Sequence, residues 1–135
     1  MKELIMDAAI ENITQAIDFV NEELRASACP ERVRVQIDIA VDELLSNIAH
    51  YAYHPDAGLA IIRVEVNKEP LSVVISFIDN GKPYDPLEKE DPDITLSMEE
   101  REIGGLGIYM VKKSMDEVSY EYKDGQNILR IKKKI

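Results

Sequence analysis

The sequence predicts an α+β fold in which a layer of helices covers a mixed, mainly antiparallel β-sheet. Apolar residues recur at helical spacing along most of residues 9–53, and from residue 62 the pattern changes to the alternation of half-buried strands. Near the C-terminus, Asp124-Gly125 separates two alternating segments, and this dipeptide is a strong hairpin signal. Helices grouped first and strands joined in hairpins are typical of this two-layer architecture.

Three elements are expected before residue 54. Residues 2–8 are expected to form an edge strand, which leads into a helix over residues 9–26. Pro30 suits the first position of a second helix, where its missing N–H costs nothing. That helix should end near residues 51–53, because the residue before Pro55 disfavours helical backbone. The apolar stripes of the two helices are Ile10, Ile13, Ile17, Val20 and Leu24, then Val33, Ile37, Ala40, Val41, Leu44 and Ile48.

The remaining regular elements are four strands and one helix. Residues 62–67 alternate between apolar and polar side chains, and residues 71–79 form a second strand after a short turn. A third helix is predicted over residues 105–115. Two strands, residues 118–123 and 127–133, then form the C-terminal hairpin.

Composition indicates one soluble cytoplasmic domain over residues 1–135. The length fits one compact core, and no apolar run approaches the length of a membrane span. The net charge of −10 argues against nucleic-acid binding, because phosphate contacts need a basic face. A single cysteine, Cys29, cannot form an internal disulfide, which indicates a reducing compartment.

Residues 82–103 are predicted to form a long loop without regular structure. This stretch contains three prolines, and between Asp85 and Glu102 it contains eight acids and two bases. A structureless segment of this length inside a compact domain is usually functional or disordered.

Glu43 and Asn47 form the first candidate site. Their four-residue spacing places both side chains on one face of the second helix, beside its apolar stripe. The Asn47 side-chain carbonyl suits a single protein ligand of a magnesium ion that keeps most of its waters and nucleotide oxygens. Glu43 is placed to take a proton from a hydroxyl or water. The alternative is an ordinary solvated border of the helix.

Asp79-Asn80-Gly81 is the second candidate site, at the end of a predicted strand. Asn-Gly between apolar runs usually marks a hairpin, but two prolines soon after it, Pro83 and Pro86, would spoil a return strand. Asp79 is suited to accept a hydrogen bond from the exocyclic amine of adenine, and Gly81 lets a ring approach closely.

Gly104-Gly105-Leu106-Gly107 is the third candidate site, at the start of the third helix. Glycines permit close backbone approach, and free amides at a helix N-terminus attract phosphate. The run matches neither a P-loop nor a dinucleotide fingerprint. A plain hinge is the alternative.

The order and spacing of these three sites resemble the nucleotide-binding boxes of the GHKL ATPases, which share the histidine-kinase-like ATPase fold. Within that superfamily, the runs 41–48, 79–86, 104–109 and 115–118 look most like the stand-alone anti-sigma-factor serine/threonine kinases. A sensor histidine kinase would need a phospho-accepting helical domain upstream, and the sequence shows none. We read His50, one turn after Asn47, as a surface residue.

The resemblance implies a cofactor set of ATP and Mg²⁺, and roles for individual residues. Glu43 would be the general base, and Asn47 would hold Mg²⁺. Asp79 and Gly81 would hold adenine. The loop of residues 82–103 would act as a flexible lid. The phosphates would be wrapped by Gly104, Gly105, Leu106 and Gly107 and touched by the one arginine of the lid, Arg101.

The last strand departs from the family pattern. Where those kinases tend to carry small hydroxyl residues that help hold adenine, this chain has Gln126 and Asn127. We therefore include Asn127 among the candidate nucleotide-binding residues.

Three functions stay open from the sequence. The resemblance implies a kinase that phosphorylates an anti-anti-sigma (STAS-type) partner and sequesters a sigma factor, with regulation of transcription as the consequence. It also implies a homodimer. The alternatives are a non-catalytic module that uses ATP to grip a partner and a simple ATP hydrolase. Glu43 favours the kinase, because a pure nucleotide switch needs no base there.

Overall fold

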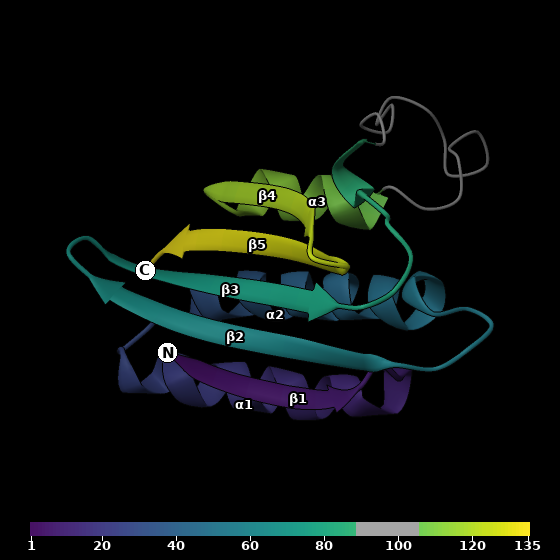
Figure 1. Ribbon diagram of the computed structural model, residues 1–135. Helices are drawn as coiled ribbons and strands as arrows, with labels where there is room; N and C mark the ends of the chain where they lie inside the picture. The colour runs from purple at the N-terminus through teal and green to yellow at the C-terminus, as the bar shows by residue number, and fades with distance from the viewer. Residues whose placement is uncertain (89–105) are drawn as a thin grey trace.

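The computed structural model describes residues 1–88 and 106–135. Five strands form one sheet in the order β1-β2-β3-β5-β4 (Figure 1). Each pairing among the described strands is antiparallel, so the α+β prediction is confirmed and no parallel pair is found in this part of the chain. The strands are β1 (Lys2–Asp7), β2 (Leu59–Lys68), β3 (Leu71–Asp79), β4 (Glu117–Lys123) and β5 (Gln126–Lys134).

The three α-helices of the described residues lie together on one face of the sheet (Figure 1). They are α1 (Ile13–Ala26), α2 (Glu31–Asn47) and α3 (Leu106–Ser114). Short helical segments also occur, namely the 3₁₀ turns η1 (Ile10–Asn12) and η3 (Pro86–Glu88) and the π-helical segment η2 (Ile48–Ala52).

Three helix boundaries differ from the prediction. Residues 9–26 do not form one helix, because a 3₁₀ turn precedes α1. Pro30 is the N-cap of α2 rather than its first residue, with an extended backbone at φ −60° and ψ 146°. Regular α2 ends at Asn47, and the residues expected to continue it are wound as the π-helix η2. Hydrophobic spacing is nearly the same in an α-helix and a π-helix over one turn, so the sequence pattern does not separate them.

The core lies between the helices and the inner face of the sheet. Alternate residues of β3, including Val73, Ile75 and Phe77, point towards the helices and are almost completely buried. They pack with apolar residues of α2 such as Val41 and Leu44. Burial of a side chain like Phe77 contributes about 1.5–3 kcal/mol. This packing holds the C-terminal ends of α2 and β3 in register.

A small network joins the chain after β3 to the segment after α2. The Tyr53 hydroxyl donates to the Leu59 carbonyl at 2.6 Å and accepts from the Asn80 N–H at 2.8 Å. The Lys82 N–H donates to the Ala52 carbonyl at 3.1 Å. These contacts place the end of β3 directly beside η2.

None of the helices that the structure describes has the length and apolar character needed to cross a membrane.

Candidate functional site

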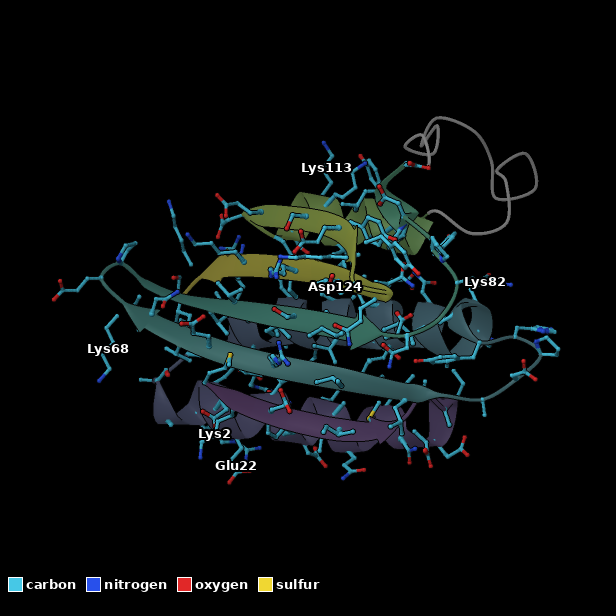
Figure 2. All side chains as sticks on the ribbon, viewed as in Figure 1. Lys2, Glu22, Lys68, Lys82, Lys113 and Asp124 are labelled. Atoms are coloured by element: carbon cyan, nitrogen blue, oxygen red, sulfur yellow. The ribbon has the colours of Figure 1, made fainter. Side chains whose placement is uncertain are left out.

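A cleft opens where α2 and η2 meet the ends of β3, β4 and β5. Its empty volume, including the open mouth, is about 430 Å³. Lys82 marks this end of the sheet, and Lys68 marks the opposite end (Figure 2). The cleft is lined mainly by apolar and aromatic side chains with a few polar ones, namely Leu44, Asn47, Ile48, Ala52, Phe77, Asp79, Tyr84, Pro86, Tyr120, Asn127 and Leu129. Such a lining suits a flat organic ring with one polar edge.

Glu43 and Asn47 occupy successive turns near the end of α2, and both are half-buried. Asn47 lines the cleft, whereas Glu43 lies outside the cleft lining. Burial raises the pKa of Glu43, and the neighbouring carboxylate of Asp42 raises it further. The carboxyl group of Glu43 is therefore a stronger base than an exposed glutamate.

Gly107, in the first turn of α3, lies against the Glu43 carboxyl group. A β-carbon placed on Gly107 would be 2.1 Å from Glu43 Cδ and 2.3 Å from each carboxyl oxygen. A residue with a side chain would therefore displace Glu43 or α3. The absence of a side chain at Gly107 allows the start of α3 to pack directly against the Glu43 carboxyl group.

Asp79 stands at the end of β3 and is 5% exposed. Its Oδ1 accepts from the Gly81 N–H and from Asn127 Nδ2, each at 2.9 Å. No described residue donates to its Oδ2, and Asp79 lines the cleft. Burial raises the pKa of Asp79, while the two hydrogen bonds oppose that rise. One carboxylate oxygen is thus held by the protein, and the other is left for a donor in the cleft.

Asn127 is the residue that holds Asp79 in place. Its Nδ2 donates to Asp79 Oδ1 and, at 2.8 Å, to the Lys82 carbonyl. Its Oδ1 accepts from the Tyr84 N–H at 3.1 Å and from the Tyr120 hydroxyl. Asn127 is 6% exposed, and both ends of its amide are used within the protein. In this structure Asn127 therefore positions Asp79 and the chain after β3.

Gly81 has a different reason for being glycine from the one expected. A β-carbon there would lie 2.3 Å from the backbone oxygen of Ala52. Gly81 is also outside the cleft lining. Its missing side chain lets the chain after β3 pass against η2, which in turn shapes the wall of the cleft.

The other predicted site residues lie at the start of α3 or before it. Leu106 is the first residue of α3. Arg101, Gly104 and Gly105 lie outside the described residues, as does the predicted lid from residue 89 onward. The described part of that predicted lid, residues 82–88, includes Tyr84 and Pro86 of the cleft wall.

Two tyrosines of the site were not predicted. Tyr84 lines the cleft, and its ring centroid is 5.8 Å from that of Tyr51. Tyr120, on β4, lines the cleft and donates to Asn127; burial raises the pKa of its hydroxyl, which therefore stays a donor. Side chains alternate between the two faces of β4, and this alternation places Tyr120 on the inner face. The same alternation of apolar and polar residues in the sequence could have predicted its position.

Comparison with known proteins places the chain in a family. The family model described as "Histidine kinase-like ATPase domain" matches residues 6–133. The serine/threonine-protein kinase BtrW of Bordetella bronchiseptica is 30% identical over 100 residues, which cover 74% of this chain and 70% of BtrW. The serine-protein kinase RsbW of Bacillus cereus is 30% identical over 98 residues, which cover 70% of this chain but only 60% of RsbW.

The fold is also found in a solved structure. The crystal structure of the RsbU and RsbW domains of Rv1364c from Mycobacterium tuberculosis superposes with a TM-score of 0.67 over 99% of this chain and 32% of that one, at 16% sequence identity. At that identity the match supports the fold alone. The family model spans nearly the whole chain, and the antiparallel sheet with its helical layer agrees with the fold of the solved structure. The chain belongs to the family of histidine kinase-like ATPase domains.

Proposed function

We propose that this chain is an ATP-dependent serine/threonine protein kinase of the anti-sigma-factor type. It would act in the cytoplasm on an anti-anti-sigma (STAS-type) protein and bind a sigma factor, thereby regulating transcription. The names of the two kinase relatives support the reaction class. The observation that carries the proposal is the Glu43 carboxyl group packed against Gly107 at the start of α3, one helical turn from the cleft residue Asn47.

The adenine ring fits the apolar part of the cleft. Leu44, Ile48 and Leu129 supply apolar walls, and the free Oδ2 of Asp79 supplies the one acceptor that a purine amino group needs. Guanine has a carbonyl oxygen at that position, and two facing acceptors repel. The site is therefore proposed to select ATP over GTP.

The phosphates would extend from this pocket towards Asn47 and α3. The amides of Leu106 and Gly107 at the start of α3, and those of Gly104 and Gly105 just before it in the sequence, would bind them, with Arg101 as a further donor. Among residues 1–88 and 106–135, no group of three or more acidic, histidine or cysteine side chains is arranged to hold a metal. The proposal therefore gives Mg²⁺ one protein ligand, the Asn47 carbonyl oxygen, with waters and phosphate oxygens as the rest. The ion would supply neutralisation of the phosphate charge.

Glu43 would remove the proton from the attacking hydroxyl of the partner's serine or threonine. The oxygen of that hydroxyl bonds to the γ-phosphorus, the bond to the β-phosphate oxygen breaks, and ADP leaves. The raised pKa of Glu43 brings its basicity closer to neutral pH, where a general base works best. Positioning and charge neutralisation would supply most of the remaining rate.

The test uses labelled ATP, Mg²⁺ and a STAS-type partner with Glu43→Gln. Transfer should fall by about 10²–10⁴-fold, as for the loss of a general base, while ATP still binds. Glu22→Gln, an exposed glutamate on α1, makes the same chemical change away from the cleft and should leave transfer unchanged. Transfer that survives Glu43→Gln would remove Glu43 from this role. A partner complex without label would favour the ATP-gated binding module, and free phosphate alone would favour an ATP hydrolase.

A further inference from the structure

Exposed apolar side chains occur on α2 and α3, the two helices that meet at Glu43. On α2, Ile39 is 57% exposed and Val35 is 43% exposed, and on α3, Met110 is 52% exposed. None of the three is a member of the core cluster or of the partly buried side chains packed against it. By contrast α1, which the structure describes from end to end, has no exposed large apolar side chain. Packing within the fold therefore does not account for these three residues.

The helices α2 and α3 pack against each other and run in opposite directions. α3 begins where Gly107 lies against the Glu43 carboxyl group, near the end of α2. It ends towards the opposite end of the sheet, where the Ser114 carbonyl accepts from Lys133 Nζ at 2.6 Å and Lys133 pairs with Val73 at the start of β3. A step forward along α3 from Gly107 therefore corresponds to a step backward along α2 from Glu43.

This arrangement brings Ile39 and Met110 to the same stretch of the groove between the helices. At a rise of about 1.5 Å per residue, Ile39 lies about 6 Å from Glu43 along α2, and Met110 lies about 4.5 Å from Gly107 along α3. Spacings of four and three residues keep each side chain on the helix face of its contact residue. We call these two residues the Ile39–Met110 pair. Val35 lies one turn further away, about 12 Å from Glu43.

Charged side chains border the Ile39–Met110 pair. Asp42 follows Ile39 by three residues on α2, and Lys113 follows Met110 by three residues on α3; both are exposed. Lys113 Nζ lies 5.5 Å from the centroid of the Tyr109 ring, so its charge stays at the surface of α3. An apolar centre with a charged border has the layout of an interface core and rim.

We infer that the Ile39–Met110 pair recognises the protein substrate, by contacting an apolar side chain two residues away from the acceptor serine or threonine. The inference rests on the proposed function, which brings the acceptor hydroxyl to the Glu43 carboxyl group. In an extended segment, side chains two residues apart point the same way and are about 6.6–7 Å apart. Glu43 and Ile39 are separated by nearly the same distance along α2, about 6 Å. A segment with its hydroxyl at Glu43 therefore places its second neighbour on the pair.

The position and size of the pair favour a substrate segment over a second copy of the chain. The cleft beyond Asn47 is taken by the nucleotide in the proposed complex, which leaves the α2–α3 groove as the described surface next to Glu43. Two side chains make a contact for one apolar side chain, whereas a stable interface between two proteins needs about 800 Å² on each. The pair thus acts as a specificity contact within a larger encounter.

The test measures transfer of labelled phosphate to a STAS-type partner, with the partner varied at saturating ATP. Ile39→Gln and Met110→Gln keep good helix formers but end in an amide. Each should raise the KM for the partner at least about fivefold with little change in kcat, because the contact is made equally before and during transfer. Val35→Gln is the matched control on the same helix, and its KM should stay within about twofold of wild type. Ile39→Leu, which remains apolar, should keep the wild-type KM.

A change in the partner distinguishes a direct contact from an indirect effect. Replacing the partner's apolar residue two positions from the phosphorylated hydroxyl by alanine should also raise KM. Combined with Ile39→Gln, the two effects should multiply to less than their product, because both remove the same contact. The affinity for ATP and the melting temperature of each kinase variant should stay at the wild-type values, because the pair lies outside the cleft and the core.

The outcomes separate this inference from the kinase proposal. Unchanged KM in both glutamine variants, an equal rise for Val35→Gln, effects on the two proteins that simply multiply, or a phosphorylated partner whose second neighbours are both polar would overturn the inference and leave the kinase proposal standing. A wild-type chain that labels no STAS-type partner would refute the kinase proposal, and the inference with it.

Discussion

Asn127→Asp tests the network that holds Asp79. The substitution keeps the shape of the side chain but replaces Nδ2, which donates to Asp79 Oδ1 at 2.9 Å and to the Lys82 carbonyl at 2.8 Å, by an oxygen. Asp79 Oδ1 keeps the Gly81 N–H, whereas the Lys82 carbonyl loses this donor. One buried acceptor without a partner costs about 1–3 kcal/mol, and two carboxylates at hydrogen-bond distance add repulsion. We expect the free energy of unfolding to fall by about 2–4 kcal/mol at neutral pH.

The same substitution should make stability depend on pH. Two adjacent carboxylates cannot both ionise at low cost, so the pair holds a proton with a folded-state pKa above the value of 3.8 that an ordinary aspartate has. A raised folded-state pKa contributes stability that is present at low pH and is lost as the pH rises through that pKa. The protonated carboxyl group also restores one donor to the pair. The deficit of the variant should therefore shrink on acidification.

Urea denaturation followed by circular dichroism, at about pH 5 and about pH 8, measures both effects. Asn80→Asp is the matched control, because Asn80 is exposed, adjoins Asp79, and has no hydrogen bond to its side chain among the described residues. The control should lose less than about 0.5 kcal/mol, as surface substitutions usually do. An Asn127→Asp variant as stable as Asn80→Asp at both pH values would refute the positioning role of Asn127.

Three further predictions concern the same site. Gly107→Ala should reduce phosphoryl transfer at least about tenfold with little change in melting temperature, because the three atoms nearest to the new methyl group belong to the flexible end of Glu43. Gly81→Ala should lower the free energy of unfolding by about 1–3 kcal/mol, because its methyl group meets the backbone of Ala52, which cannot move aside; an unchanged urea midpoint would contradict this. ATP affinity measured by calorimetry should fall on acidification, beginning above the ordinary aspartate pKa, because protonated Asp79 no longer accepts at both oxygens; a flat profile would contradict the adenine assignment.

Local patterns predicted each strand and α-helix, but not every boundary. β3 was predicted with its observed bounds, because a turn at Glu69-Pro70 and a break at Asn80-Gly81 limit a continuous apolar run. The end of α2 was less predictable. The last turn of that helix and η2 have similar apolar spacing. The π-helical segment also accepts a hydrogen bond from the Lys82 N–H at the Ala52 carbonyl, a contact between residues distant in sequence.

The sequence predicted residues that line or adjoin the cleft, such as Asn47, Asp79 and Glu43, but not their contacts. Glu43 and Asn47 are placed on one face by helix geometry alone, and the structure shows that face at the cleft and at α3. Which atom lies opposite a glycine is set by residues distant in sequence. From the sequence, the missing side chain of Gly81 was expected to make room for a ring. In the structure, the backbone oxygen of Ala52 is the atom nearest to the position of that missing side chain.

Asn127 shows why the residue type alone did not predict the hydrogen bonds at the last strand. The family pattern has small hydroxyl residues at this strand, where they help to hold adenine. From the sequence, Asn127 was therefore expected to contact the nucleotide in their place. In the structure its amide is used up by Asp79, the Lys82 carbonyl, the Tyr84 N–H and the Tyr120 hydroxyl. A small hydroxyl cannot make four such bonds, because it has one hydrogen and two lone pairs. The larger residue thus orders the chain after β3 and fixes Asp79 at once. Under the proposed function, discrimination between adenine and guanine would then depend on Asp79 Oδ2, the oxygen to which no described residue donates.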